Sequence, residues 1–226
     1  MKNKLVKIGI VVAVVLLGLF AYKKINAAEL HGGFSASYNS ELSFRGISTA
    51  QDGIQTTFDT SLDLAGFEIG VGGLVNTRDG TDEVRLQAHT QVKILEGIDT
   101  SVGVVNYTDN HVLGNGTEVY AELGLGIILD PSIRVYYNPD GGITTVEGSV
   151  TKNLEVWENY ALGLSVNAGN TELAGDRATY YGLNALVTRA INEETSLFVG
   201  VDLTDVKDVA DTDEIVSVFG GIQHTF

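Results

Sequence analysis

The chain has 226 residues, of which 27 are Gly, two are Pro and none is Cys. The absence of Cys excludes disulfide frameworks and thiolate metal sites, and the length suits one all-β domain. The formal net charge is −15, so the chain should repel nucleic acid and attract cations. Acidic residues that only keep the loops solvated are the alternative explanation of this charge.

The N-terminal residues have the order of a secretory signal peptide. Three Lys precede an apolar run at 8–22, which is short for a membrane helix, and two Ala follow at 27–28. Two further Lys after the run keep an uncleaved anchor open as the alternative. We predict a signal peptide at residues 1–27 and a single further domain at residues 28–226. Cleavage there would leave nine Lys and Arg against 29 Asp and Glu.

Alternation of apolar and polar residues predicts strands with one apolar face. Val84, Leu86 and Ala88 share one face, for example, whereas Arg85 and Gln87 share the other. The pattern recurs along the chain and predicts twelve strands. Their residues are 33–45, 54–65, 67–77, 83–95, 98–108, 117–129, 132–138, 143–154, 160–168, 179–189, 195–204 and 214–226.

The predicted connections alternate in length. Those after even-numbered strands are tight, such as Asp130–Pro131, whereas those after odd-numbered strands are longer and rich in Gly, Asp and Asn. The polar turn 46–53 and the loops 108–116, 169–178 and 205–213 belong to the second group. Short periplasmic turns that alternate with longer external loops are typical of an up-and-down membrane barrel.

Barrel geometry favours a wet lumen over a packed core. Twelve strands about 4.8 Å apart and tilted about 40° close into a barrel of about 12 Å backbone radius. Val, Ala and Gly would leave voids in such an interior, whereas an apolar face turned to lipid and a polar face turned to water would not. The predicted fold is therefore all-β: an antiparallel up-and-down transmembrane β-barrel of 12 strands. A soluble β-sandwich is the alternative.

Aromatic residues gather near the ends of the predicted strands, as in the interfacial girdles of membrane barrels. One group lies toward the long loops: Tyr107, Tyr136, Tyr137, Tyr180 and Tyr181. The other lies toward the short turns: Phe67, Trp157, Tyr160 and Phe226. Ordinary strand aromatics of a β-rich protein are the alternative interpretation.

The last strand ends on Phe226 and resembles the assembly signal of bacterial outer-membrane barrels. Phe219 lies on its polar face and His224 on its apolar face, so the pattern is imperfect. We expect this strand to pair with the first strand around Phe34 and to close the barrel.

With the apolar face outward, charged residues of the other parity should face the lumen. Rings of charged side chains set ion selectivity, and acidic ones favour cations. The alternative is that opposite charges brace one another and plug the lumen. The predicted lumen-lining residues are Glu41, Arg45, Asp59, Asp63, Arg85, Lys93, Glu122 and Glu147.

No catalytic residue, metal site or cofactor is predicted. His89 would face the lumen beside two Gln, without the nucleophile or acid that a hydrolase pairs with a His. The acidic stretch 205–214 lacks the ligand spacing of an EF-hand loop. These patterns indicate a protein that is not an enzyme.

Residues 44–48, Phe-Arg-Gly-Ile-Ser, stand at the end of the first predicted strand, and a polar turn and a second strand near Gln55 follow. This box resembles that of the TorF-type porin family, and the match covers about residues 39–57. The family's common Pro in the turn is missing, since Gly53 and Ile54 stand there. The resemblance implies an outer-membrane channel and supplies no catalytic residues. A box that only shapes the end of a hairpin is the alternative.

Taken together, the sequence predicts a porin-like channel in the outer membrane of a Gram-negative bacterium. It would pass ions or small solutes by passive diffusion and would be narrow and leaning to cations. Its expected partners are outer-membrane lipid and lipopolysaccharide, the barrel-assembly machinery through the last strand, and small solutes or cations, but not nucleic acid. The alternatives are a non-conducting structural or surface-interaction barrel and a lipid-modifying enzyme that uses His111 or His224.

Overall fold

The computed structural model describes residues 29–44, 47–64, 67–77, 82–110, 114–173, 176–207 and 214–226. In these ranges the chain forms twelve strands, and no helix there has the length and apolar character needed to cross a membrane. The strands are β1 (Glu29–Phe44), β2 (Ile47–Leu64), β3 (Phe67–Thr77), β4 (Glu83–Leu95), β5 (Ile98–Asn110), β6 (Gly114–Leu125), β7 (Pro131–Asn138), β8 (Ile143–Trp157), β9 (Tyr160–Leu173), β10 (Asp176–Ala190), β11 (Thr195–Lys207) and β12 (Ile215–Thr225).

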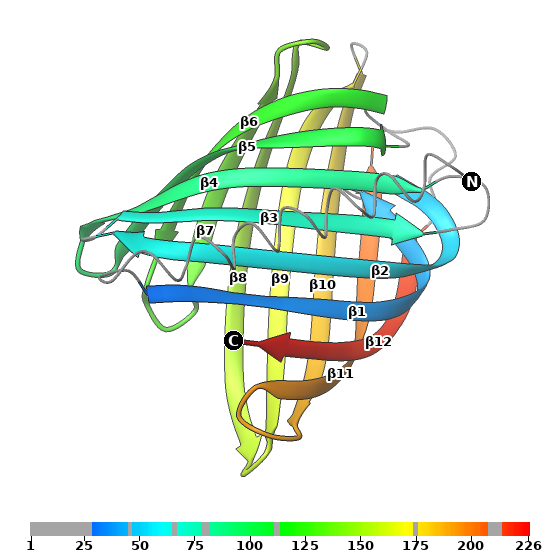
Figure 1. Cartoon of the computed structure of the whole chain (residues 1–226). Helices are drawn as coiled ribbons and strands as arrows, with labels where there is room; N and C mark the ends of the chain where they lie inside the picture. The colour runs from blue at the N-terminus through cyan, green and yellow to red at the C-terminus, as the bar shows by residue number, and fades with distance from the viewer. Residues whose placement is uncertain are drawn as a thin grey trace, which may run out of the picture.

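The strands close into one antiparallel barrel, as predicted. Each strand pairs with its neighbour in the sequence, and β12 pairs with β1. In Figure 1, β1 to β5 run across the strands β7 to β10 behind them, as expected for two walls of a barrel whose strands are strongly tilted. The alternative fold, a soluble β-sandwich, is therefore excluded, because the sheet has no free edge.

Alternation sorts the side chains between the two faces of this sheet. On β5, Val102 and Val104 are exposed on the outside, whereas Val105 and Tyr107 line a cavity inside the barrel. On β3, Ile69 and Val71 are likewise exposed outside. The apolar parity therefore faces outward, as the sequence predicted.

At the rim of the barrel where each odd-numbered strand connects to the strand that follows it, the strands are longer than predicted. β2 already begins at Ile47, within the predicted polar turn. β5 and β6 cover most of the predicted loop 108–116, and β9 and β10 cover most of the predicted loop 169–178. Polar residues pair across these strand ends, as when Asn170 Nδ2 donates to Thr179 Oγ1 at 3.0 Å. The residue types in these segments are typical of turns, and for that reason the sequence predicted loops where the strands in fact continue to pair.

The predicted end of the sixth strand at residue 129 is wrong. β6 ends at Leu125, and residues 126–130 turn the chain toward β7. The Gly126 amide donates to the Gly97 carbonyl at 2.9 Å, and Asp130 adopts a positive φ of 39°. The apolar residues 127–129 continue the strand pattern in sequence, but the turn exposes their side chains.

The pairing of the first and last strands confirms the predicted seam. Phe34 stands opposite His224, and their rings lie 5.3 Å apart. The Phe226 amide donates to the Gly32 carbonyl at 2.9 Å, and the Gly32 amide donates to the Phe226 carbonyl at 3.2 Å. The two ends of the described chain therefore lie side by side, on the same rim as the turns after the even-numbered strands.

Candidate functional site: the barrel lumen

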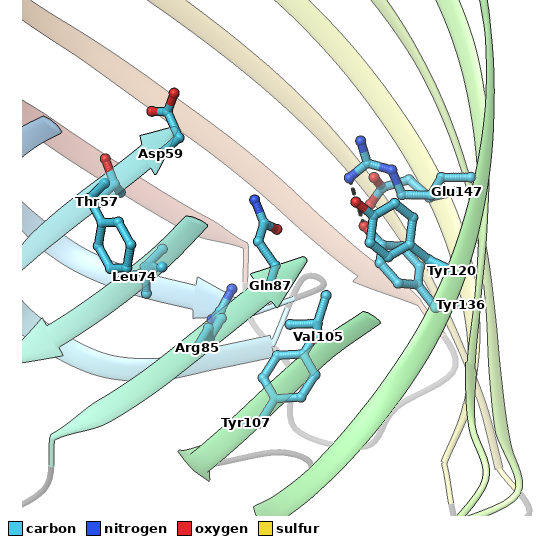
Figure 2. A pocket seen from close by; sticks show the side chains of 13 residues that line it. Thr57, Asp59, Leu74, Arg85, Gln87, Val105, Tyr107, Tyr120, Tyr136 and Glu147 are labelled. Atoms are coloured by element: carbon cyan, nitrogen blue, oxygen red, sulfur yellow. Dashed lines mark hydrogen bonds between the residues drawn. The ribbon is translucent and has the colours of Figure 1, made fainter. Parts of the chain in front are cut away.

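Three adjoining cavities lie in the lumen between the described residues. The first, of about 410 Å³, lies between β2–β5 and β6–β8, as Figure 2 shows with Asp59 on one side and Tyr120 and Glu147 on the other. The second and third have about 260 Å³ each. Asp59 lines both the first and the second cavity, and Phe198 lines both the second and the third. Open space therefore extends along much of the interior.

A row of charged side chains crosses β6, β7 and β8 in the lumen. Glu122, Arg134 and Glu147 stand opposite one another in the strand register. Arg134 Nε donates to Glu122 Oε2 at 2.9 Å, and Nη2 reaches the same oxygen. Arg134 Nη1 donates to the Tyr136 hydroxyl at 2.9 Å, and the guanidinium lies 5.4 Å from the centre of the Tyr120 ring. Charge pairing and ring contacts together hold Arg134 in place.

The same row continues to β10 across a glycine. Gly169 of β9 stands opposite Glu147 of β8 on one side and Tyr180 of β10 on the other. The Tyr180 hydroxyl passes over Gly169 and donates to Glu147 Oε2 at 2.6 Å. Because glycine has no side chain, the ring can lie along the wall and reach a strand two places away. We call the residues Glu122, Arg134, Glu147, Gly169 and Tyr180 the charged row.

A second network joins β3, β4 and β5. Glu83 is fully buried, and its carboxylate accepts hydrogen bonds from Arg85 Nε at 2.5 Å and Asn110 Nδ2 at 2.7 Å. Asn76 Nδ2 donates to the other Glu83 oxygen at 3.3 Å. A buried carboxylate is costly without such donors, so these contacts account for its position.

A third polar contact lies next to this network. The Tyr107 hydroxyl of β5 donates to Glu118 Oε2 of β6 at 2.8 Å, and Glu118 is fully buried. The Tyr107 ring lies 5.8 Å from the guanidinium of Arg85. This contact therefore extends the second network to a fourth strand.

Burial divides the lumen into two halves. The closed half lies toward the connections after odd-numbered strands, and the open half toward the termini. Among the described residues, all buried polar side chains lie in the closed half: Ser37, Asn39, Asn76, Glu83, Asn110, Glu118, Asn138, Thr145, Thr171, Thr204 and Ser217. Lumen residues of the open half, such as Ser149, Thr151 and Thr188, stay partly exposed.

Five of the eight predicted lumen-lining residues lie in or beside the described cavities. Asp59, Arg85 and Glu147 line the first cavity, and Glu41 lines the third. Glu122 joins the charged row through Arg134. Their place in the lumen is therefore described by the structure, whereas a role in permeation stays a prediction.

Of the remaining three predicted residues, only Asp63 has a described side chain. Asp63 is exposed near the end of β2 and is not among the lining residues. Arg45 and Gly46 of the Phe-Arg-Gly-Ile-Ser box lie outside the described residues. The side chain of Lys93 also lies outside them, although its backbone pairs with Asp99.

Sequence reasoning missed several residues that organise the lumen. Glu83 and Glu118 have the lumen parity of their strands, so alternation alone could have included them. Tyr107, Tyr136 and Tyr180 were predicted to lie in an outer girdle, but they point into the barrel. The signal that separates these three from the exposed Tyr137 and Tyr181 is the alternation of side chains between the two faces of a strand, not the aromatic residue type.

Solved structures similar to this chain include outer-membrane porins. The KdgM porin matches with a TM-score of 0.57 at 12% identity, over 87% of this chain and 99% of that one. The NanC porin matches with a TM-score of 0.57 at 14% identity, over 85% of this chain and 98% of that one. The COG4313 outer membrane channel from Pseudomonas putida F1 matches with 0.54 at 12% identity, over 89% and 97%. This chain has the fold of the outer-membrane porins.

These likenesses concern the fold, because the identities are low. No protein-family model matches the sequence, and no curated protein does. The resemblance of residues 39–57 to TorF-type porins therefore stays a prediction.

Proposed function

We propose that this chain is a channel of the Gram-negative outer membrane, through which ions or small solutes diffuse passively with a preference for cations. The observation that carries the proposal is the closed barrel with an apolar outer face and polar cavities inside. A barrel satisfies its backbone polar groups by strand pairing, which is the condition for crossing lipid with strands.

The outer face supports a membrane location. Apolar side chains stay exposed along the strands, and aromatic ones mark the rim of the termini, where Trp157 is 74% exposed and packs edge-on to Tyr160. Arg189 lies on the same rim, 5.7 Å from the centre of the Tyr160 ring. Aromatic and basic residues at this position suit the boundary between lipid tails and headgroups, lipopolysaccharide included.

The cavity walls support the preference for cations. The described lining residues include four carboxylates, Glu41, Asp59, Glu147 and Asp202, and two guanidinium groups, Arg85 and Arg134. Each arginine is already paired with a glutamate that lies outside the lining, Glu83 or Glu122. Carboxylates therefore outnumber guanidinium groups among the described lining residues, which favours a cation.

Conductance across a planar bilayer tests the channel. Protein whose folding is verified by heat-modifiable migration on a gel should give discrete channel events. Under a KCl gradient, the zero-current potential should have the sign of K⁺ preference. Folded protein without channel events would contradict the proposal, and a chloride preference would contradict the finer part of it.

Neutralising carboxylates in the lumen tests the source of the selectivity. The double variant Asp59→Asn with Asp202→Asn should move the zero-current potential toward that of chloride, because both groups line cavities. Glu193→Gln serves as the matched control, since Glu193 is exposed on the turn between β10 and β11. Equal shifts in the two proteins would mean that the surface charge, rather than the lumen, sets the preference.

A non-conducting structural barrel is the second candidate, and the buried polar side chains of the closed half favour it. Side chains that satisfy one another, as around Glu83, leave fewer groups for a passing ion. The same bilayer experiment decides between the two candidates, because a structural barrel would fold and yet give no channel events.

The last strand supports a further part of the proposal, recognition by the barrel-assembly machinery. Phe226 is half exposed at the seam, where its backbone completes the pairing with Gly32. An exposed terminal aromatic residue beside the seam suits a signal that is read before the barrel closes.

A further inference from the structure

The charged row contains one position without a side chain, and a tyrosine ring covers it. We infer that Gly169 keeps the Tyr180 ring flat against the barrel wall and so sets the width of the bore beside Glu147. This inference rests on the proposed channel function and names the residues that control the bore beside Glu147.

The geometry at Gly169 leaves no room for a methyl group. A Cβ atom placed on Gly169 would lie 2.6 Å from Tyr180 Cε1 and even closer to Cζ and the hydroxyl oxygen. All three nearest atoms belong to the Tyr180 side chain, and no backbone atom is among them. An alanine at this position would therefore displace the ring and leave the strand pairing intact.

We expect the displaced ring to move toward the lumen. Tyr180 is 1% exposed and packs in a small apolar cluster with Ala178 of its own strand and Val206 of β11. Val206 also stands opposite Tyr180 in the register, on the side away from Gly169. With β9 on one side and Val206 on the other, rotation of the side chain carries the ring inward.

Movement of the ring would also release Glu147. The Tyr180 hydroxyl is bonded to Glu147 Oε2 at 2.6 Å, and Glu147 lines the 410 Å³ cavity. Loss of this bond would free a carboxylate in the cavity while the ring narrows it. Different measurements distinguish the two effects. A freed carboxylate changes the ion preference, whereas an obstructing ring lowers the conductance.

The same arrangement recurs at other lumen glycines. Gly103 stands opposite Tyr120, which lines the first cavity, and Gly200 stands opposite Phe219, which lines the second and third. At both glycines, however, a Cβ would also come within 2.7 Å of a backbone carbonyl oxygen. Of these three glycines, Gly169 is therefore the one at which the effect of the ring can be measured without a clash with the backbone.

The experiment compares single-channel conductance of the full chain and four variants in planar bilayers. Gly169→Ala should lower the conductance at least about twofold, because the ring enters the bore. Gly169→Ala with Tyr180→Ala should restore it, because the ring is gone. Tyr180→Phe removes only the hydroxyl, so it should keep the wild-type conductance and change the ion preference.

Gly124→Ala is the matched control. Gly124 also faces the lumen, and the nearest atom to an added Cβ is 3.9 Å away, so this variant should conduct like the wild type. Wild-type conductance in folded Gly169→Ala would overturn the inference, and so would a loss that persists in the double variant. If Gly169→Ala does not fold, Tyr180→Trp decides, because a larger ring on an intact glycine should also lower the conductance. A wild-type protein without channel events would instead contradict the proposed function.

Discussion

The closed and open halves of the barrel are built on the same strands, yet their lumen side chains behave differently. In the closed half, long polar side chains reach neighbouring strands, as Tyr180 reaches Glu147 and Tyr107 reaches Glu118. In the open half, short hydroxyls face one another, as in the Ser132–Ser149 contact of 2.8 Å. Strand alternation places polar residues in both halves, but side-chain length and register decide whether these residues bond across strands or stay exposed to water.

The largest expected difference between the halves is in the stability cost of removing one carboxylate from each. Glu83→Ala should lower the free energy of unfolding by about 3 kcal/mol, because Arg85, Asn76 and Asn110 each lose the buried carboxylate that accepts their hydrogen bonds. Glu68→Ala should cost less than about 0.5 kcal/mol, since its side chain is 40% exposed. Urea unfolding of the barrel in lipid vesicles measures both. Similar losses would mean that the halves do not differ in stability.

Access to the two halves can be compared with cysteine labelling, because the chain has no native Cys. Thr188→Cys lies in the open half and Thr145→Cys in the closed half, where Thr145 is fully buried. A membrane-impermeant thiol reagent should label position 145 at least about tenfold more slowly, because a buried thiol reacts only after local opening. The labelling rates of denatured protein provide the control. Equal rates in the folded barrel would refute the division into halves.

The smallest effect concerns single hydroxyl groups. Tyr107→Phe should lower the free energy of unfolding by about 1–2 kcal/mol, because buried Glu118 loses a donor. Thr151→Val removes the 3.2 Å bond to Ser165 in the open half and should cost less than about 0.5 kcal/mol, since water can replace it. The same urea experiment measures both. A larger cost for Thr151→Val would reverse the comparison.

Much of the fold could be predicted because period-two alternation is a local property. β3 and β4 have the predicted bounds, and the outward parity holds along them. The ends were harder, since Ile127 and Ile128 keep an apolar pattern through a turn, whereas polar Asn170 lies within a strand. At the ends of strands, the residue type indicates whether the side chain is exposed to water, but not whether the backbone is paired.

The site was less accessible to prediction, because its contacts depend on register. Parity predicted that Glu122 and Glu147 share the inner face of the sheet, but it could not predict their link through Arg134. The bond from Tyr180 to Glu147 spans two strand spacings and requires Gly169 between them. Such a contact joins residues 33 positions apart, and only the paired strands reveal it.

The seam between β1 and β12 has a consequence for how the barrel folds. Every other pairing joins strands that follow one another in the sequence, so each can form as a local hairpin. The seam joins distant parts of the chain, as when the Ser217 hydroxyl donates to the Glu41 carbonyl across 176 positions. Closing so long a loop costs the most entropy while the chain is open, and much less once eleven hairpins have curved the sheet. The contact between Phe34 and His224 should therefore be among the last to form.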